Sequence, residues 1–173
     1  VNVSALQFRN SKRLYQAVRQ AIGLSKLPGS RLVLEITEGT MVHDFDVVRG
    51  VMMHIKKLGV AFALDDFGSG YCSLNYLDRL PFDKVKIDRS LVVTANSNKT
   101  QEIIIKMVSQ IAREQCALVV VEGIETQAQA IHMRQLGATH AQGYFFGKPV
   151  ADQSALMKGG AHVPRKLKLA ANH

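Results

Sequence analysis

The sequence predicts an α/β fold built on a parallel sheet, and three observations support this class. Short apolar, β-branched segments recur along the chain, and longer segments with helical periodicity separate them. The repeat runs strand, helix, strand, helix at a spacing of about 23–33 residues, as in successive βαβ units. Polar residues gather at the carboxyl ends of the apolar segments, where the strands of a (β/α)8 barrel form its active-site mouth.

The strands are predicted from apolar, β-branched composition. The first is a stub in VNVS at residues 1–4. The five clear strands that follow are RLVLEIT (31–37), VAFALDD (60–66), DKVKID (83–88), ALVVVEG (117–123) and HAQGYFF (140–146).

The helices between them are predicted from apolar residues that recur on one face. The helix over 10–23 places Leu14 and Val18 together, and the helix over 44–59 is well placed to end at Gly59. Two further helices cover 100–115, with a possible cap at Thr100, and 126–137, which closes with Gly137.

Two architectures share this pattern, a doubly wound open sheet and an eight-stranded barrel. Composition does not separate them, but the polar strand ends favour a TIM-like (β/α)8 barrel. A complete barrel has eight strands and typically about 250 residues. We therefore expect this chain of 173 residues to lack roughly the first two strands of the barrel. The first residue is not Met, which also suggests a fragment or a processed product.

We expect one barrel domain over residues 1–152, followed by a terminal helix and basic tail over 153–173. The stretch 158–173 holds four of the 22 Lys and Arg residues and no acid, so part of the net charge of +8 is local. The rest of the chain carries a small net positive charge, which suits an anionic substrate. We expect no DNA or RNA partner.

The sequence also indicates in which cellular compartment the domain lies. No apolar run approaches the roughly 18 residues of a membrane-spanning helix, and the N-terminus lacks the regions of a signal peptide. Cys72 and Cys116 show neither a disulfide framework nor a zinc-site spacing and fit two reduced thiols. We expect a cytoplasmic domain, which can belong to a membrane-anchored parent protein.

Acidic and amide side chains recur at the same level of successive units. They are Asn2, Glu35, Glu38, Asp65, Asp66, Asp88, Glu122, Glu125 and Gln142, with Lys86 as a lone cation among them. An oxygen-only ligand set suits Mg²⁺ or Mn²⁺ and not zinc. Divalent ions would also relieve the repulsion between converging carboxylates. Two ions about 3.5–4 Å apart can clamp the attacking and leaving oxygens of a phosphate displacement.

Each of these residues, taken alone, has a structural explanation. Glu35 fits a helix cap or a loop salt bridge, Glu125 suits a helix N-terminus, and Lys86 fits an ordinary strand position. Recurrence at one level of successive units favours a common site. The GSG stretch at 68–70 lacks the further glycine and the lysine of nucleotide-binding loops, so we interpret it as a flexible loop after a strand.

Five stretches in this order and spacing resemble the EAL domain family: VNVSALQF, LEITE, ALDDFGSGYCSLNYLDRLPFDKVKIDRSLV, VVVEGIET and QGYFFGKPV. The family comprises bacterial phosphodiesterases that hydrolyse the second messenger cyclic di-GMP to linear pGpG. Its fold is a TIM-like barrel that uses two Mg²⁺ or Mn²⁺ ions. The resemblance covers nearly all of residues 1–150.

The resemblance implies a set of metal ligands. Asn2, Glu35 and Asp65 match ligand positions, with Asp65 bridging the two ions. Asp66 matches a residue that contacts the second ion directly or through water. Glu122 matches an acid that contacts a metal or activates the water.

The resemblance implies further roles around these ligands. Lys86 would orient the nucleophilic water, and Gln142 would position water and substrate. Glu38 and Glu125 match residues that hold the loop 66–74, which contains Gly68 and Gly70, and the surroundings of the site. Asp88 matches a motif position without a defined role. Phe146 and Pro149 would lie near a guanine base.

The departures from the family pattern define the rival interpretations. Cys72 and Ser69 replace the usual Ser and Thr. The Glu-Ala-Leu motif, whose Glu is a metal ligand, does not occur, and its expected place lies upstream of Val1, in agreement with the strand count. We expect the C-terminal two-thirds of an active phosphodiesterase that is weak or inactive alone. The alternative is an inactive cyclic di-GMP receptor or a protein-docking module. A homodimer and flanking sensor or diguanylate-cyclase-like domains are further expectations.

Overall fold

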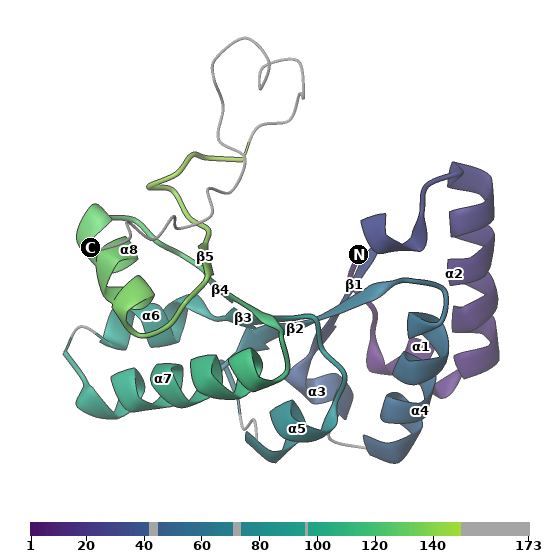
Figure 1. Cartoon of the computed structure of the whole chain (residues 1–173), viewed down its shortest axis with the longest axis horizontal. Coiled ribbons are helices and arrows are strands. Elements are labelled where there is room, and N and C mark those ends of the chain that lie inside the picture. The colour runs from purple at the N-terminus through teal and green to yellow at the C-terminus, as the bar shows by residue number, and fades with distance from the viewer. Residues whose placement is uncertain (42–44, 71–73, 96, 150–173) are drawn as a thin grey trace, which may run out of the picture.

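The computed structural model describes residues 1–41, 45–70, 74–95 and 97–149 (Figure 1). The predicted tail at 153–173, the end of the predicted domain at 150–152 and Cys72 lie outside the described residues. Cys116 is a free, exposed thiol. Within the described ranges, no helix is long and apolar enough to cross a membrane.

A parallel sheet of five strands forms the centre of the fold. The strands are β1 (Val33–Thr37), β2 (Ala61–Phe67), β3 (Lys84–Ile87), β4 (Leu118–Val121) and β5 (His140–Ala141). Their order in the sheet is their order in the chain, and every pairing is parallel. The prediction of a parallel α/β fold is confirmed. In the described part of the chain the sheet is open, with β1 and β5 near opposite ends.

The stub predicted at residues 1–4 is present as a single parallel bridge. Asn2 pairs with Glu35, the Val3 amide donates to the Glu35 carbonyl at 2.8 Å, and the Glu35 amide donates to the Val1 carbonyl at 2.8 Å. These bonds extend the sheet beyond β1 and place Asn2 beside Glu35.

Helices connect the strands and cover one face of the sheet. The four long ones match predictions: α2 (Ser11–Ser25), α4 (Phe45–Lys56), α7 (Lys99–Glu114) and α8 (Gln127–Gln135). Five short elements were not predicted, because each is too short to show a helical period: α1 (Ala5–Arg9), η1 (Gly29–Arg31), α3 (Glu38–Met41), α5 (Leu74–Arg79) and α6 (Arg89–Ala95). The cap of α7 is Asn98, whose side chain accepts from the Thr100 amide at 3.0 Å, so the cap predicted at Thr100 is wrong.

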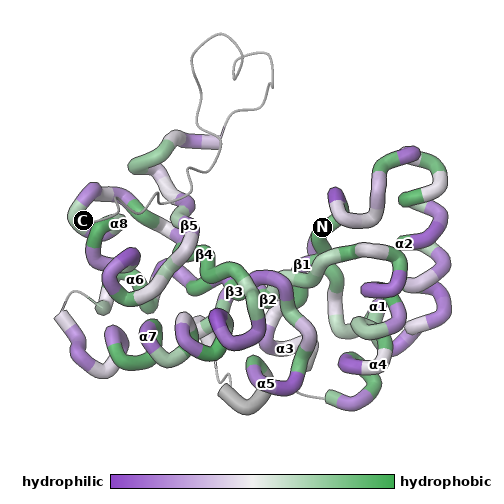
Figure 2. Tube along the Cα trace, viewed as in Figure 1, coloured by the Kyte–Doolittle hydropathy of each residue, from purple (hydrophilic) through white to green (hydrophobic). Residues whose placement is uncertain are grey.

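The core lies between the sheet and its helices. Alternate strand residues that face the helices are fully buried, including Ile36, Phe62, Leu64, Val85, Ile87, Val119 and Val121. The strand segments are mostly apolar along their length, whereas the helices alternate apolar and polar residues (Figure 2). Intervening residues such as Glu35, Lys86 and, directly after β4, Glu122 are only partly buried. The sheet therefore has one helix-covered face and one that carries the polar side chains.

The last strand is shorter than the predicted 140–146. The Gln142 amide still donates to the Val121 carbonyl at 2.8 Å, but the chain then turns, and the Phe146 amide donates to the Gly143 carbonyl at 3.0 Å. The run of aromatic residues suggested a strand, but in the structure it forms a turn that follows the carboxyl end of β5.

Candidate active site at the carboxyl ends of the strands

Side chains from four neighbouring strands meet around the ammonium group of Lys86. Lys86 Nζ lies 2.6 Å from Asp65 Oδ1, 2.9 Å from Glu122 Oε1 and 3.6 Å from Glu35 Oε1. The side chains of Lys86, Asp65 and Glu122 are 15%, 14% and 20% exposed, so they lie in a recess that water still reaches. The parallel register of β1 to β4 brings these residues to the same edge of the sheet.

A bulge in β2 presents two consecutive aspartates at this edge. Leu64 pairs with Val85 and Phe67 pairs with Ile87, so three steps along β2 match two along β3. Asp66 takes up the extra residue with a positive φ of 55°. Successive residues of a regular strand would point to opposite faces. Here one carboxylate oxygen each from Asp65, Asp66 and Glu122 lie within 4.8 Å of one another.

Burial and the charges of the cluster shift the pKa values of Asp66 and Lys86. Partial burial raises the pKa of Asp66, and the negative charges of Asp65 and Asp88 raise it further. Burial lowers the pKa of Lys86, but its hydrogen bonds to Asp65 and Glu122, and then their charges, outweigh burial and raise that pKa above its ordinary value. Lys86 is therefore a cation at neutral pH and can donate hydrogen bonds.

The donor set fits a hard divalent cation. Three carboxylates converge, and no sulfur or imidazole ligand joins them among the described residues. The neighbouring Lys86 supplies one positive charge to these three negative groups.

Glu38 holds the loop that follows β2. It is the first residue of α3 and is only 8% exposed, and its Oε1 accepts a hydrogen bond from the Gly68 amide at 2.8 Å. Its Oε2 is buried without a hydrogen-bond partner among the described residues. A Cβ at Gly70 would lie 2.9 Å from that oxygen. Glu38 therefore contacts the start of the loop at Gly68, and its role in holding the whole loop 66–74 stays a prediction.

The two amides lie at the same edge without a described side-chain contact to the carboxylates. Asn2 is placed by its bridge to Glu35. Gln142 is exposed and follows β5, where its carbonyl accepts from the Ile124 amide at 3.0 Å.

The remaining predicted residues lie around the rim. Asp88 Oδ1 accepts from the Ser90 amide at 2.8 Å and so caps the start of α6. Burial raises the pKa of Asp88, but the hydrogen bonds from Ser90, and also from Arg89, outweigh it and lower that pKa. Glu125 forms an ion pair of 2.6 Å with Arg89. Sequence reasoning missed Arg89, because only its contacts across the fold distinguish it from any other exposed arginine.

The aromatic turn after β5 has one inward ring and two exposed rings. Phe146 packs against the hydrophobic core, whereas Tyr144 and Phe145 are exposed, and Pro149 is exposed as well. The rings of Phe145 and Phe146 meet edge to face with centroids 5.1 Å apart.

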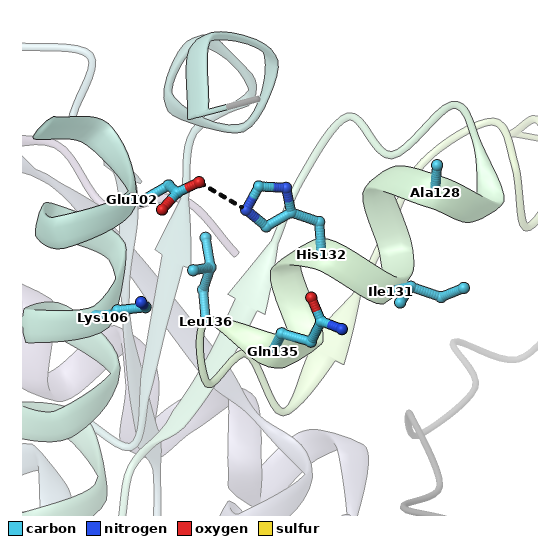
Figure 3. A pocket seen from close by; sticks show the side chains of 7 residues that line it. All are labelled: Glu102, Lys106, Ala128, Ile131, His132, Gln135 and Leu136. Carbon is cyan, nitrogen blue, oxygen red and sulfur yellow. Dashed lines mark ion pairs between the residues drawn. The ribbon is translucent and has the colours of Figure 1, made fainter. Parts of the chain in front are cut away.

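A separate cavity of about 530 Å³ lies between α7 and α8 (Figure 3). Glu102 of α7 faces His132 of α8 across it, with 3.3 Å between Oε1 and Nε2. It has a single carboxylate and shares no lining residue with the strand-end cluster. The chemistry therefore points to the cluster and not to this cavity.

Comparison with known proteins agrees with the fold. The family model of the EAL domain matches residues 1–149. The chain is 42% identical over 165 residues to protein y4lL of Sinorhizobium fredii. It is 36% identical over 156 residues to the bifunctional diguanylate cyclase/cyclic di-GMP phosphodiesterase MucR of Pseudomonas aeruginosa. The two alignments cover 94% and 90% of this chain, but only 20% and 23% of the length of those relatives.

Solved structures give the same result. The MucR phosphodiesterase in complex with c-di-GMP superposes with a TM-score of 0.81 at 36% identity, over 90% of this chain and 63% of that one. The EAL domain of Mycobacterium smegmatis DcpA gives a TM-score of 0.82 at 33% identity, over 94% and 73%. A manganese and c-di-GMP complex of Klebsiella pneumoniae BlrP1 gives 0.78 at 27% identity, over 86% and 38%. The predicted fold class and family are confirmed, and the chain belongs to the EAL domain family.

Proposed function

We propose that this chain carries the catalytic cluster of a cyclic di-GMP phosphodiesterase that yields linear pGpG. The observation that carries the proposal is the convergence of Asp65, Asp66 and Glu122 around the edge occupied by Lys86. The related MucR protein bears the name of a cyclic di-GMP phosphodiesterase, which supports the same reaction here.

Asp65, Asp66 and Glu122 would hold metal, with Glu35 and Asn2 completing the coordination from β1 and its bridge. We propose two Mg²⁺ or Mn²⁺ ions. When bound, such ions supply a water of lowered pKa and neutralise charge on the phosphate. The BlrP1 neighbour was solved with manganese, which is consistent with this metal class.

The chain's own residues then have distinct tasks. Lys86 forms ion pairs with Asp65 and Glu122, so as a cation it would orient the attacking water as a hydrogen-bond donor, and proton removal falls to a carboxylate. We assign that proton transfer to Glu122, which lies 2.9 Å from Lys86 Nζ. Gln142 follows the neighbouring strand β5 and would position the water and substrate with its amide.

The aromatic turn after β5 is the proposed contact for a guanine base. We retain Phe146 and Pro149 as residues near the base. Phe146 packs against the core, whereas the ring of Tyr144 is exposed, with Lys148 Nζ 5.7 Å from its centroid, and is the more accessible ring for stacking. The mildly basic composition suits the two phosphates of the substrate.

A second candidate function is binding of cyclic di-GMP without hydrolysis. Among the described residues, one group of three carboxylates lies close enough to share an ion. A two-ion reaction needs ligands for both ions. This chain alone would then act as a receptor or a protein-docking module, and we expect its hydrolysis to be weak.

The experiment measures pGpG formation from cyclic di-GMP by chromatography, with Mn²⁺, in this chain and in a chain extended at its N-terminus. We expect hydrolysis in the extended chain, and we expect Asp65→Asn and Glu35→Gln in that chain to abolish it. Full activity in either variant would contradict the assignment. Tight binding by calorimetry with no turnover in the extended chain would support the receptor.

We also propose a parent protein with flanking sensor or diguanylate-cyclase-like domains, because the MucR relative is bifunctional and much longer than this chain. A cytoplasmic location is a separate proposal. A homodimer is a further proposal, which light scattering on the purified chain would test.

A further inference from the structure

The first turn of α6 lies between the carboxyl ends of β2 and β4, which carry the proposed metal-binding carboxylates. The Asp88 amide donates to the Phe67 carbonyl at 3.0 Å, and the Glu122 amide donates to the Ile87 carbonyl at 3.0 Å. The segment 87–91 is therefore hydrogen-bonded to the end of β2 on one side and to the end of β4 on the other.

Two side chains of this turn reach across to a glycine on either side. Leu91 packs so closely on Gly68 that a Cβ there would overlap its side chain, and Gly68 has a φ of 94°. The aliphatic carbons of Arg89 lie over Gly123 in the same way, and Gly123 has a φ of 71°. Each glycine thus meets a conformation and a close approach that a larger residue would not tolerate.

Arg89 is also fixed at its far end. Its guanidinium lies 2.6 Å from Glu125 Oε1, and the amide of Glu125 donates to the Gln129 side chain at 2.8 Å at the start of α8. The arginine therefore spans the loop from Gly123 to Glu125, directly after the metal-binding residue Glu122.

We propose that the first turn of α6 is a positioning element for the metal site, with Arg89 and Leu91 as its positioning residues. Leu91 bears on the loop that follows Asp65 and Asp66, and Arg89 bears on the loop that follows Glu122. Together they set the spacing between carboxylates that come from different strands. This inference rests on the proposed metal-dependent function.

The expected effect acts through geometry and not through the ion pair itself. Arg89 and Glu125 are 58% and 44% exposed, and an exposed pair of this kind adds little stability. Outer partners that orient metal ligands typically change metal affinity by about 10–100-fold when they are removed. We expect Arg89→Ala to weaken Mn²⁺ binding by about tenfold. Arg89→Lys keeps the aliphatic stem and the charge and should restore most of that loss.

The test titrates Mn²⁺ into this chain by electron paramagnetic resonance for wild type, Arg89→Ala, Arg89→Lys and Leu91→Ala, with thermal melting of each. The matched control is Lys99→Ala, which removes another exposed cation of an ion pair, 2.9 Å from Glu102 on α7. Weaker Mn²⁺ binding in Arg89→Ala, recovery in Arg89→Lys and no change in Lys99→Ala support the proposal. Wild-type affinity in a folded Arg89→Ala overturns it.

A wild-type chain that binds no Mn²⁺ would contradict the proposed function and not the positioning. Hydrogen exchange then tests the positioning role of Arg89 without metal. Arg89→Ala should speed exchange of the Ile124 amide, which donates to the Gln142 carbonyl at 3.0 Å within the spanned loop. An unchanged exchange rate there overturns the positioning role.

Discussion

Replacement of Lys86 by Met tests whether this cation is the centre of the site. At an effective dielectric constant of about 20, a pair of unit charges 2.6 Å apart attracts by roughly 6 kcal/mol, and the desolvation of each ion offsets several kcal/mol of that. Removal of one partner from a buried ion pair costs about 3–5 kcal/mol. Because the side chains of Lys86 and Asp65 are still 15% and 14% exposed, we expect a cost at the low end of this range, about 3 kcal/mol.

For a chain of 173 residues, that loss lowers the midpoint of thermal unfolding by about 6–12 °C without metal. Mn²⁺ should then raise the melting temperature of Lys86→Met more than that of wild type, because the ion replaces the missing positive charge beside Asp65 and Glu122. Hydrolysis should be lost, since no donor remains to orient the water. The control Lys99→Met removes a lysine that is 79% exposed and should stay within about 0.5 kcal/mol of wild type.

The assay is scanning calorimetry of both variants with a chelator and with Mn²⁺, beside the hydrolysis measurement. A metal-free Lys86→Met that melts within about 2 °C of wild type would refute the central role of Lys86. A Mn²⁺ shift smaller than that of wild type would refute the idea that metal and lysine share one set of carboxylates.

Three further predictions concern the neighbours of Lys86. Asp66→Asn should stabilise the metal-free chain while it weakens Mn²⁺ binding. Because the folded chain raises the pKa of Asp66, ionisation of this carboxyl opposes folding once the pH rises above its unfolded pKa of 3.8. Chemical denaturation should therefore show the gain in stability at pH 7 and not at pH 3. Glu38→Ala removes the acceptor of the Gly68 amide and should cost about 1–3 kcal/mol by urea denaturation, with hydrolysis reduced as well. Gly68→Ala at a φ of 94° should cost at least about 1–2 kcal/mol, and unchanged stability there would argue against the close contact with Leu91.

Periodicity in the sequence predicted the elements that are long enough to show it. The helices α2, α4, α7 and α8 and the strands β1 to β4 lie within two or three residues of their expected places. The short α6 has only seven residues, so no repeat distinguishes it from a loop. Residues 142–146 have the composition of a strand, but the turn closed between Gly143 and Phe146 overrides that preference.

The site was predictable in composition but not in contacts. Recurrence of acids at strand ends identified Glu35, Asp65 and Glu122, because parallel strands bring their carboxyl ends to one edge. The ion pair of Arg89 with Glu125 joins residues 36 positions apart through two loops, which no local pattern reports. The close packing of Arg89 on Gly123 is likewise a property of the folded chain alone.

The bulge in β2 explains why two adjacent aspartates can serve one site. A regular strand would send one carboxylate of the pair toward the helices, into a core of residues such as Leu64 and Phe67, at the cost of burying an unpaired charge. The extra residue turns Asp66 toward the same edge as Asp65, at a φ of 55° that an aspartate tolerates better than most residues. Partial burial, and then the negative charges of Asp65 and Asp88, raise the pKa of Asp66, and a bound divalent cation would offset that repulsion. The fold thus holds in place, without metal, a charge imbalance that favours metal binding.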